Sequence, residues 1–362
     1  MHLNAPTYGE QAMKPEEPFI KVEHLTKIFH PAKKRSLGLP GRKNGPPGFV
    51  AVDDVSFQVE QGQIFVIMGL SGSGKSTIIR MLNRLIDASD GSISVDGKDV
   101  RSLPPAELRD YRNRTINMVF QHFGLFPHKS LVHNVDFGLK VRGMDRETRE
   151  QRAAEALELV GLGDRIHAMP DQLSGGMKQR VGLARALATD AEILLMDEPF
   201  SALDPLIRKD MQELLIKLQR NFKKTIVFVT HDLNEAMYLG DRIMVMKQGK
   251  IVQSGTALDL LEAPADPYIE KFVAEVDRSK VLTAGMLAEH HDPSPASRTS
   301  SGSFPDGAMP VSDTTFLNDL LPIFATGAGS VNVVNQQGSS LGHVTAEKVF
   351  EALSPKGFSN AS

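Results

Sequence analysis

The hydrophobic residues of this chain form short, continuously apolar runs separated by amphipathic stretches. IFVIMGL (64–70), AEILLMD (191–197) and TIVFVT (225–230) are much shorter than a membrane span and show little alternation of polar and apolar residues. Such runs are typical of strands buried on both faces of a parallel sheet. Residues 204–222, between the last two runs, have the spacing of an amphipathic helix. The pattern therefore predicts an α/β fold.

The rest of the pattern divides the chain into a core, an inserted helical segment and a tail. Strands are predicted over residues 19–29 and on both sides of EQGQ (60–63), and two turns containing DG and QG predict hairpins. The expected divisions are a loose arm (1–18), an α/β core (19–283) with a helical insert (about 123–182), a Pro/Ser-rich flexible linker (284–308) and a small tail (309–355).

Composition narrows the possible functions. The formal net charge is −3, which gives no overall basic field for nucleic acid, and the absence of cysteine excludes disulfides and thiolate metal sites. The N-terminus lacks the order of a signal peptide, so any link to a membrane is expected to go through a partner. Residues 30–49 are basic and rich in Gly and Pro. We interpret them as a solvated surface loop, with a patch for membrane headgroups or a partner as the alternative.

A phosphate-binding loop follows the first apolar run. GLSGSGKS matches the pattern G-x-x-x-x-G-K-[ST] between a predicted strand and a predicted helix, which is the context this motif requires. Its glycines let backbone N–H groups surround phosphate oxygens, Lys75 reaches the β- and γ-phosphates, and the Ser76 hydroxyl binds Mg²⁺. The expected nucleotide cradle consists of Gly69, Leu70, Ser71, Gly72, Ser73, Gly74, Lys75, Ser76 and Thr77.

Polar residues end the other predicted strands. Asp197 and Glu198 follow one apolar run, His231 follows another, and Gln121 follows a third. Because the carboxyl ends of parallel strands meet at one edge of a sheet, these residues are expected beside the phosphate loop. We predict Mg²⁺ contacts from Asp197, Gln121 and Ser76, and catalytic roles for Glu198 as general base and for His231 and Gln121 around the γ-phosphate. Taken singly, a strand-end His is more often structural, and Gln121 would be a surface residue.

Five further histidines do not predict a metal centre. They lack acidic or Cys partners at the spacing of metal ligands, so we interpret them as surface residues. This group consists of His122, His128, His133, His290 and His291.

A Ser-Gly-Gly segment opens LSGGMKQRVGLARAL (173–187), about a hundred residues after the phosphate loop. A helix that starts there offers free backbone N–H groups and the positive end of its dipole to an anion. One chain therefore carries two candidate phosphate-binding sites.

Together these motifs carry a resemblance. GLSGSGKST, the Gln in MVFQ, LSGGMKQR, LLMDEPFSALD and VTHD occur in the order and spacing of ABC-transporter ATPase subunits, and the resemblance covers about 19–283. It implies a RecA-like P-loop core with an antiparallel β subdomain and an inserted helical subdomain. It also implies a head-to-tail dimer in which Ser174, Gly175 and Gly176 contact the γ-phosphate of the other subunit and Asp204 couples the two sites. The adenine-stacking aromatic falls at Phe29, for which a place in the core is the alternative.

A narrower resemblance concerns the substrate. MLNRLI, FSALDPLIR and DPYIEKFVAEVDRSKVLTA are similar to the ATPase subunit of glycine betaine/L-proline (quaternary amine) importers. This implies an ATP- and Mg²⁺-dependent homodimer, peripheral on the cytoplasmic face of the inner membrane, that drives a membrane permease and is served indirectly by an external substrate-binding protein. The solute itself (betaine, choline, carnitine or proline) is read by those partners.

Two other functions remain as alternatives. One is an importer of another small solute. The other is a soluble ABC ATPase acting on nucleic acid, although such proteins usually carry two ATPase modules or long coiled coils, and this chain shows one module and no heptads. A P-loop kinase or GTPase would leave the LSGG segment and His231 unexplained.

The tail has its own pattern of helix (316–324), strand (330–335), turn, strand (341–344) and helix, with Thr345 as N-cap of the last helix. This small α+β unit resembles a single CBS motif. Such motifs normally work in pairs, and Lys348 stands where the family has Asp, so a degenerate remnant and a working sensor both remain open.

Overall fold

The computed structural model describes residues 18–30, 48–120, 124–274, 276–289, 309–335 and 337–354. Several predictions lie outside these residues: the arm up to residue 17, most of the basic segment 30–49, Gln121, and the linker after Glu289. The same holds for His122, His290 and His291.

A six-stranded sheet forms the centre of the molecule, in the order β10-β9-β3-β8-β7-β6. Its strands are parallel apart from β10, which forms a hairpin with β9. The strands are β3 (Ile64–Gly69), β6 (Ile116–Val119), β7 (Ile193–Asp197), β8 (Thr225–Thr230), β9 (Arg242–Lys247) and β10 (Lys250–Gly255). Every residue of β3, β7 and β8 is buried, as their largely apolar sequences predict.

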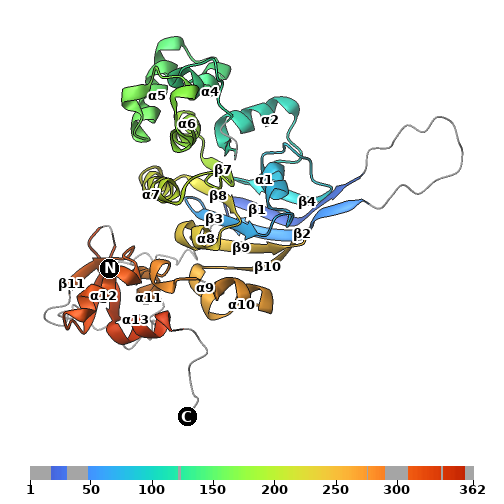
Figure 1. Cartoon of the computed structure of the whole chain (residues 1–362). Helices are drawn as coiled ribbons and strands as arrows, with labels where there is room; N and C mark the ends of the chain where they lie inside the picture. Colours follow the sequence, from blue (N-terminus) through green and yellow to red (C-terminus); the bar gives the residue numbers. More distant parts are fainter. Residues whose placement is uncertain are drawn as a thin grey trace, which may run out of the picture.

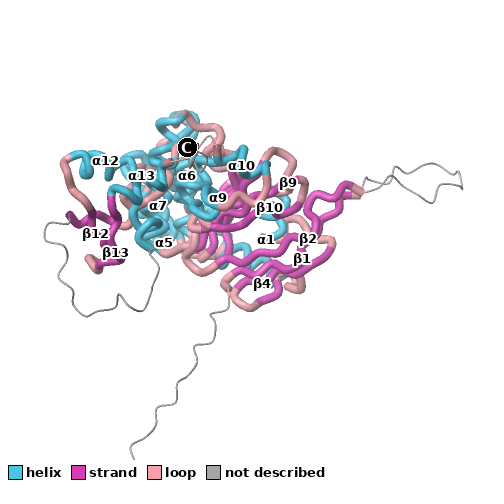
Figure 2. The backbone as a smooth tube through the Cα atoms, turned by 90° about the horizontal axis from the view of Figure 1, so that it is seen from below, coloured by secondary structure: helices cyan, strands magenta, loops and turns pink. Residues whose placement is uncertain are grey.

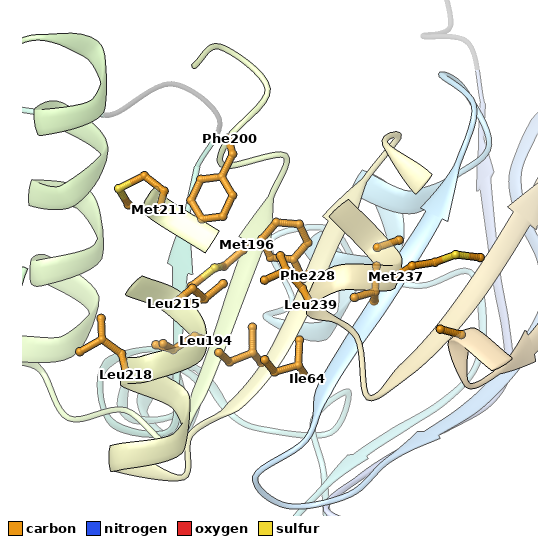
Figure 3. Packing of buried hydrophobic residues seen from close by; sticks show 14 of the residues in the cluster. Ile64, Leu194, Met196, Phe200, Met211, Leu215, Leu218, Phe228, Met237 and Leu239 are labelled. Carbon is orange, nitrogen blue, oxygen red and sulfur yellow. The ribbon is translucent and has the colours of Figure 1, made fainter. Parts of the chain in front are cut away.

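Alternation along these strands sends side chains into two separate cores. On one face, Leu194, Met196 and Phe228 pack against helix α7 (Pro205–Phe222) and helix α8 (Leu233–Leu239), as Figure 3 shows. On the other face, the intervening residues pack against helix α1 (Lys75–Leu82). The sheet is therefore a middle layer between helices, and a strand carries neighbouring residues to opposite cores.

A smaller antiparallel sheet covers the far side of α1. Its order is β2-β1-β4-β5, with β1 (Ile20–Phe29), β2 (Phe49–Val59), β4 (Asp90–Val95) and β5 (Lys98–Asp99). Its apolar residues join those of α1 in one core, and the rings of Phe57 and Phe65 stack at 5.2 Å between the two sheets. The predicted β subdomain and both hairpins are confirmed.

A group of helices projects from the sheet beyond β6 and β7 (Figure 1). It contains α3 (Leu131–Val135), α4 (Phe137–Val141), α5 (Arg146–Leu159), two 3₁₀ turns (Gly163–Arg165 and Pro170–Gln172) and α6 (Gly175–Ala188). Helix α6 packs on α3, α4 and α5 and also on α7, so it joins this group to the core. Before β6, α2 (Pro105–Asp110) and a π-helix (Tyr111–Thr115) pack on the core around α1.

The chain ends in α9 (Ala257–Glu262), α10 (Pro267–Val273), a 3₁₀ turn (Arg278–Lys280), α11 (Ala284–Glu289) and a small α+β tail. The tail has the order β11 (Met309–Ser312), α12 (Leu317–Ala325), β12 (Ser330–Val334), β13 (Ser340–Thr345) and α13 (Ala346–Leu353), with β12 between β11 and β13. In Figure 2, strands β12 and β13 of the tail lie on one side of the helices, and the two sheets of the body lie on the other side. Thr345 caps α13 as predicted, because its hydroxyl accepts from the Lys348 N–H.

The expected linker does not begin at residue 284. Residues Ala284 to Glu289 form α11, and the Ala284 N–H donates to the Thr315 carbonyl at 2.8 Å. Ala284, Leu287 and Ala288 are buried in the same core as α7 and α8. This apolar helix face ties the tail to the body, and only the sequence after it is rich in Pro and Ser.

Candidate active site

The phosphate loop between β3 and α1 is shaped by glycines that lie against other strands. Gly69, Gly72 and Gly74 all have positive φ angles, at 147°, 80° and 103°. A Cβ atom on Gly69 would lie 2.3 Å from the Met246 carbonyl oxygen, and one on Gly74 would lie 2.4 Å from the Ala51 carbonyl oxygen. No side chain fits at either position, so the loop exposes bare backbone to a ligand.

Two polar groups inside this loop suit an anion. The buried Lys75 ammonium donates to the carbonyl oxygens of Gly69 at 2.7 Å and Leu70 at 3.1 Å. Burial lowers the pKa of Lys75, while the carboxylates of Glu198 and Asp197 act in the opposite direction. The Ser73 hydroxyl is buried without a hydrogen-bond partner among the described residues. A phosphate would give the Ser73 hydroxyl a partner and the Lys75 ammonium, which has three N–H donors, a further acceptor.

Ser76 and Asp197 meet at the edge of the sheet, as predicted. The Ser76 hydroxyl donates to Asp197 Oδ1 at 2.7 Å, and Arg80 lies 3.4 Å from the other carboxylate oxygen. A hydroxyl and a carboxylate are the hard oxygen ligands that Mg²⁺ prefers. The described residues hold no cluster of three or more His, Asp or Glu side chains for a metal, so phosphate and water would complete the shell.

Glu198 and His231 are brought together by neighbouring strands. Glu198 Oε2 lies 3.1 Å from His231 Nδ1, and the Glu198 N–H donates to the Val229 carbonyl at 3.0 Å. The Glu198 side chain is 21% exposed and that of His231 55%. Glu198 also has a φ of 48°, a left-handed conformation that costs a non-glycine residue about 1–3 kcal/mol and is concentrated at functional sites.

The Ser-Gly-Gly segment (174–176) starts α6. The Ser174 hydroxyl caps this helix by accepting from the Met177 N–H at 3.4 Å, and Ser174 and Gly175 are exposed. Gly176 is buried, and a Cβ atom there would lie 2.3 Å from Ile207 Cγ2 of the same chain. Gly175 thus faces outward, whereas Gly176 serves the packing of α6 on α7.

Asp204 begins α7 with an exposed side chain that makes no capping hydrogen bond. The neighbouring Leu206 is 72% exposed. Leu203, the residue before Asp204, has its Cδ2 atom 3.9 Å from the Cβ position of Gly175. The starts of α6 and α7 therefore form one outward surface.

Comparison with known proteins agrees with this geometry. A family model described as ABC transporter matches residues 52–201. The chain is 54% identical over 275 residues, 74% of this chain and 69% of the relative, to a glycine betaine/carnitine transport ATP-binding protein of Listeria monocytogenes. The chain belongs to the family of ABC transporter ATP-binding proteins.

This ABC ATPase is also similar to a second relative and to a solved structure. It is 40% identical over 343 residues to a trimethylamine N-oxide transport ATP-binding protein of Pelagibacter ubique, covering 93% of this chain and 98% of that relative. It is also similar to a solved ATP-binding cassette, a dimer in a post-hydrolysis state bound to ADP and Pi. That likeness has a TM-score of 0.57 and 34% identity, and covers 66% of this chain and 98% of the other.

Phe29 of this ABC ATPase is an exposed residue. It lies at the end of β1 opposite Phe49 of β2, is 40% exposed, and has the Lys27 ammonium 5.0 Å from its ring centroid. The alternative that Phe29 belongs to the core is therefore wrong.

Several polar residues around the site were not singled out from the sequence. Arg80 lies one helical turn after Ser76, a spacing that puts both on one face of α1 and signals the contact with Asp197. Arg208, Asp232 and Glu235 come from α7 and the start of α8 and meet behind His231. Only their tertiary contacts mark them, because Arg208 lies 24 residues before Asp232 in sequence.

No helix among the described residues combines the length and the apolarity needed to cross a bilayer.

Proposed function

We propose that this ABC ATPase is the ATP-hydrolysing subunit of an importer for glycine betaine/proline-type quaternary amine compatible solutes. The observation that carries the proposal is the 54% identity to a glycine betaine/carnitine transport ATP-binding protein, together with a complete set of nucleotide-site motifs. In this role, the chain converts ATP hydrolysis into movement of a membrane permease.

The site residues divide the chemistry among them. Backbone N–H groups of the phosphate loop and the Lys75 ammonium hold the β- and γ-phosphates. Glu198 takes a proton from the attacking water as the bond between the β- and γ-phosphates breaks, and His231 keeps the Glu198 carboxylate in place. Inorganic phosphate and ADP leave, and Glu198 returns its proton to solvent.

Mg²⁺ fits the oxygen ligands at the edge of the sheet. Ser76 and Asp197 would hold the ion, and Gln121, which follows β6, is the third protein ligand proposed from the sequence. When bound, the ion supplies positive charge that neutralises the phosphate oxygens.

The exposed starts of α6 and α7 support a head-to-tail dimer. Ser174 and Gly175 would approach the γ-phosphate held by the partner's loop, and Asp204 would contact the partner beside it. The solved cassette that resembles this chain is itself dimeric and was captured with ADP and Pi. A permease, and indirectly an external substrate-binding protein, would complete the importer at the cytoplasmic face of the inner membrane.

Trimethylamine N-oxide is the alternative solute. The relative named for its transport matches 93% of this chain, a span that reaches into the tail. Glycine betaine, carnitine and trimethylamine N-oxide all carry a trimethylated, positively charged nitrogen. They form one chemical class, and the permease and binding protein discriminate within it. For the tail we propose a single CBS-like unit, in keeping with its β-α-β-β-α order.

Uptake measurements test the substrate class. Cells that lack this chain are complemented with the wild-type chain or with a Glu198→Gln variant, and uptake of radiolabelled glycine betaine, carnitine, choline, proline and trimethylamine N-oxide is measured. We expect uptake of at least one trimethylated solute to depend on the wild-type chain and to stay at background with the variant. Chain-dependent uptake of none of these five solutes would refute the proposal.

Phe29 is proposed to stack on the adenine ring. Loss of a base–aromatic stack costs about 1–3 kcal/mol, so Phe29→Ala is expected to raise the KM for ATP at least about fivefold with a small effect on kcat. Phe29→Trp should keep the stack. The matched control is Phe49→Ala, which removes the exposed ring directly opposite on β2. Equal KM changes in both alanine variants would contradict a specific role for Phe29.

A further inference from the structure

Behind the nucleotide site lies a buried network centred on Glu235 of α8. The Thr230 hydroxyl donates to Glu235 Oε2 at 2.5 Å, and the side-chain amide of Gln212 donates to Glu235 Oε1 at 3.1 Å. Glu235 and Thr230 are both almost fully buried, and burial raises the pKa of Glu235. The proposed hydrolysis chemistry assigns no role to this buried acid.

The network holds the chain on both sides of His231. Thr230 precedes His231, and its hydroxyl also accepts from the Asp232 N–H at 3.0 Å. Asp232 follows His231, caps α8 through the Glu235 N–H at 3.2 Å, and pairs with Arg208 of α7 at 3.1 Å. The backbone that carries His231 is thus anchored to α8 and α7 rather than left as a free loop.

The same network reaches the outward surface at the start of α7. Arg208 Nη2 donates to the carbonyl oxygen of Leu203, the residue before Asp204, at 3.3 Å. Gln212 lies one turn further along α7 and completes the second link to Glu235. Two connections therefore join α7, whose first residues face the proposed partner subunit, to the segment that carries His231. One runs through Arg208 and Asp232, the other through Gln212 and Glu235.

We propose that Glu235 is a positioning residue for ATP hydrolysis, which fixes His231 against Glu198 and links this pair to the start of α7 at the subunit interface. This inference rests on the proposed roles of Glu198 and His231. A displacement of α7 on dimer closure would move the backbone on both sides of His231, because each side is hydrogen-bonded to the network. Hydrolysis would then be favoured only in the closed dimer.

A double-mutant cycle tests the proposal on the full-length chain. In the wild-type background, Glu235→Ala is expected to lower kcat between about tenfold and a hundredfold and to change the KM for ATP less than about twofold, because geometry at the reacting atoms is lost while nucleotide contacts remain. In a His231→Ala background, measured by single turnover, the same change should have almost no further effect, because Glu235 acts through His231.

Two companion variants separate positioning from folding. Glu235→Gln is expected to keep most of the activity, because a neutral amide can pair with both Thr230 and a flipped Gln212. Gln212→Ala should lower kcat in the same direction as Glu235→Ala. The matched control is Gln219→Ala, two turns further along α7, whose side chain donates to the Gly62 carbonyl away from His231. It should leave kcat near wild type.

The outcomes distinguish the inference from the function beneath it. If His231→Ala leaves kcat unchanged, the proposed role of His231 in hydrolysis is wrong, and the positioning role of Glu235 is refuted with it. If His231→Ala lowers kcat but Glu235→Ala reduces the rate by the same factor in both backgrounds, only the positioning role of Glu235 is refuted. A loss of thermal stability in Glu235→Ala that Glu235→Gln does not rescue in either stability or rate would also overturn it.

Discussion

A Glu198→Gln variant is expected to bind ATP with near wild-type affinity and to hydrolyse it at least about 100-fold more slowly. The change keeps the size of the side chain but removes its ability to accept a proton, and general-base catalysis typically contributes 10²–10⁴-fold. The phosphate contacts from Lys75 and the loop are untouched. ATP should therefore persist in the site and hold two subunits together, which size-exclusion chromatography with ATP would detect as a stable dimer.

Glu192→Gln is the matched control. Glu192 is exposed and lies just before β7, at the opposite end of the strand from Glu198, so its replacement should leave turnover unchanged. Wild-type hydrolysis by the Glu198→Gln variant would show that another group accepts the proton.

A Gly175→Asp variant is expected to retain ATP binding by the single chain and to lose turnover by at least about 100-fold. Gly175 is exposed, and its nearest neighbour in the Cβ direction is Leu203 Cδ2 at 3.9 Å, so the chain accommodates a side chain there. In the proposed dimer, the new carboxylate would face the γ-phosphate of the other subunit. It would replace favourable N–H contacts with repulsion between like charges.

The neighbouring glycine is a poorer choice for this test. A side chain at Gly176 would push against Ile207, 2.3 Å from its Cβ position, and so disturb α7 in the same chain. Loss of activity in Gly176→Asp would then have two explanations, packing within the chain and repulsion across the dimer.

Mixing experiments make the dimer prediction specific. A Gly175→Asp chain has an intact phosphate loop, and a Lys75→Ala chain has an intact Ser174–Gly175 segment. A head-to-tail heterodimer of the two contains one complete site and one doubly damaged site. The mixture is expected to regain turnover that neither variant shows alone. No recovery, with heterodimer formation verified, would mean that both motifs serve the ATP of their own chain.

Much of the fold could be predicted from the sequence because the decisive signals are local. The stretches that became β3, β7 and β8 are apolar apart from Asp197, Thr225 and Thr230 at strand ends, a pattern typical of strands covered on both faces. The start of α13 was equally readable, since Thr345 caps it with its own side chain. The linker boundary was missed because residues 284–289 form a short helix whose reason for folding is an apolar face buried against a distant part of the chain.

For the candidate active site, the sequence by itself predicted which loop and strand-end residues lie together at one edge of the sheet. Strand ends in a parallel sheet share one edge, so Ser76 with Asp197 and Glu198 with His231 could be paired before any coordinates. Only the tertiary structure decided the supporting contacts. The closeness of Gly176 to Ile207 and the burial of Glu235 beneath His231 depend on how α6, α7 and α8 pack, and the exposure of Phe29 depends on how β1 pairs with β2 at its end. Packing joins residues far apart in sequence, and no local pattern records which side chains meet.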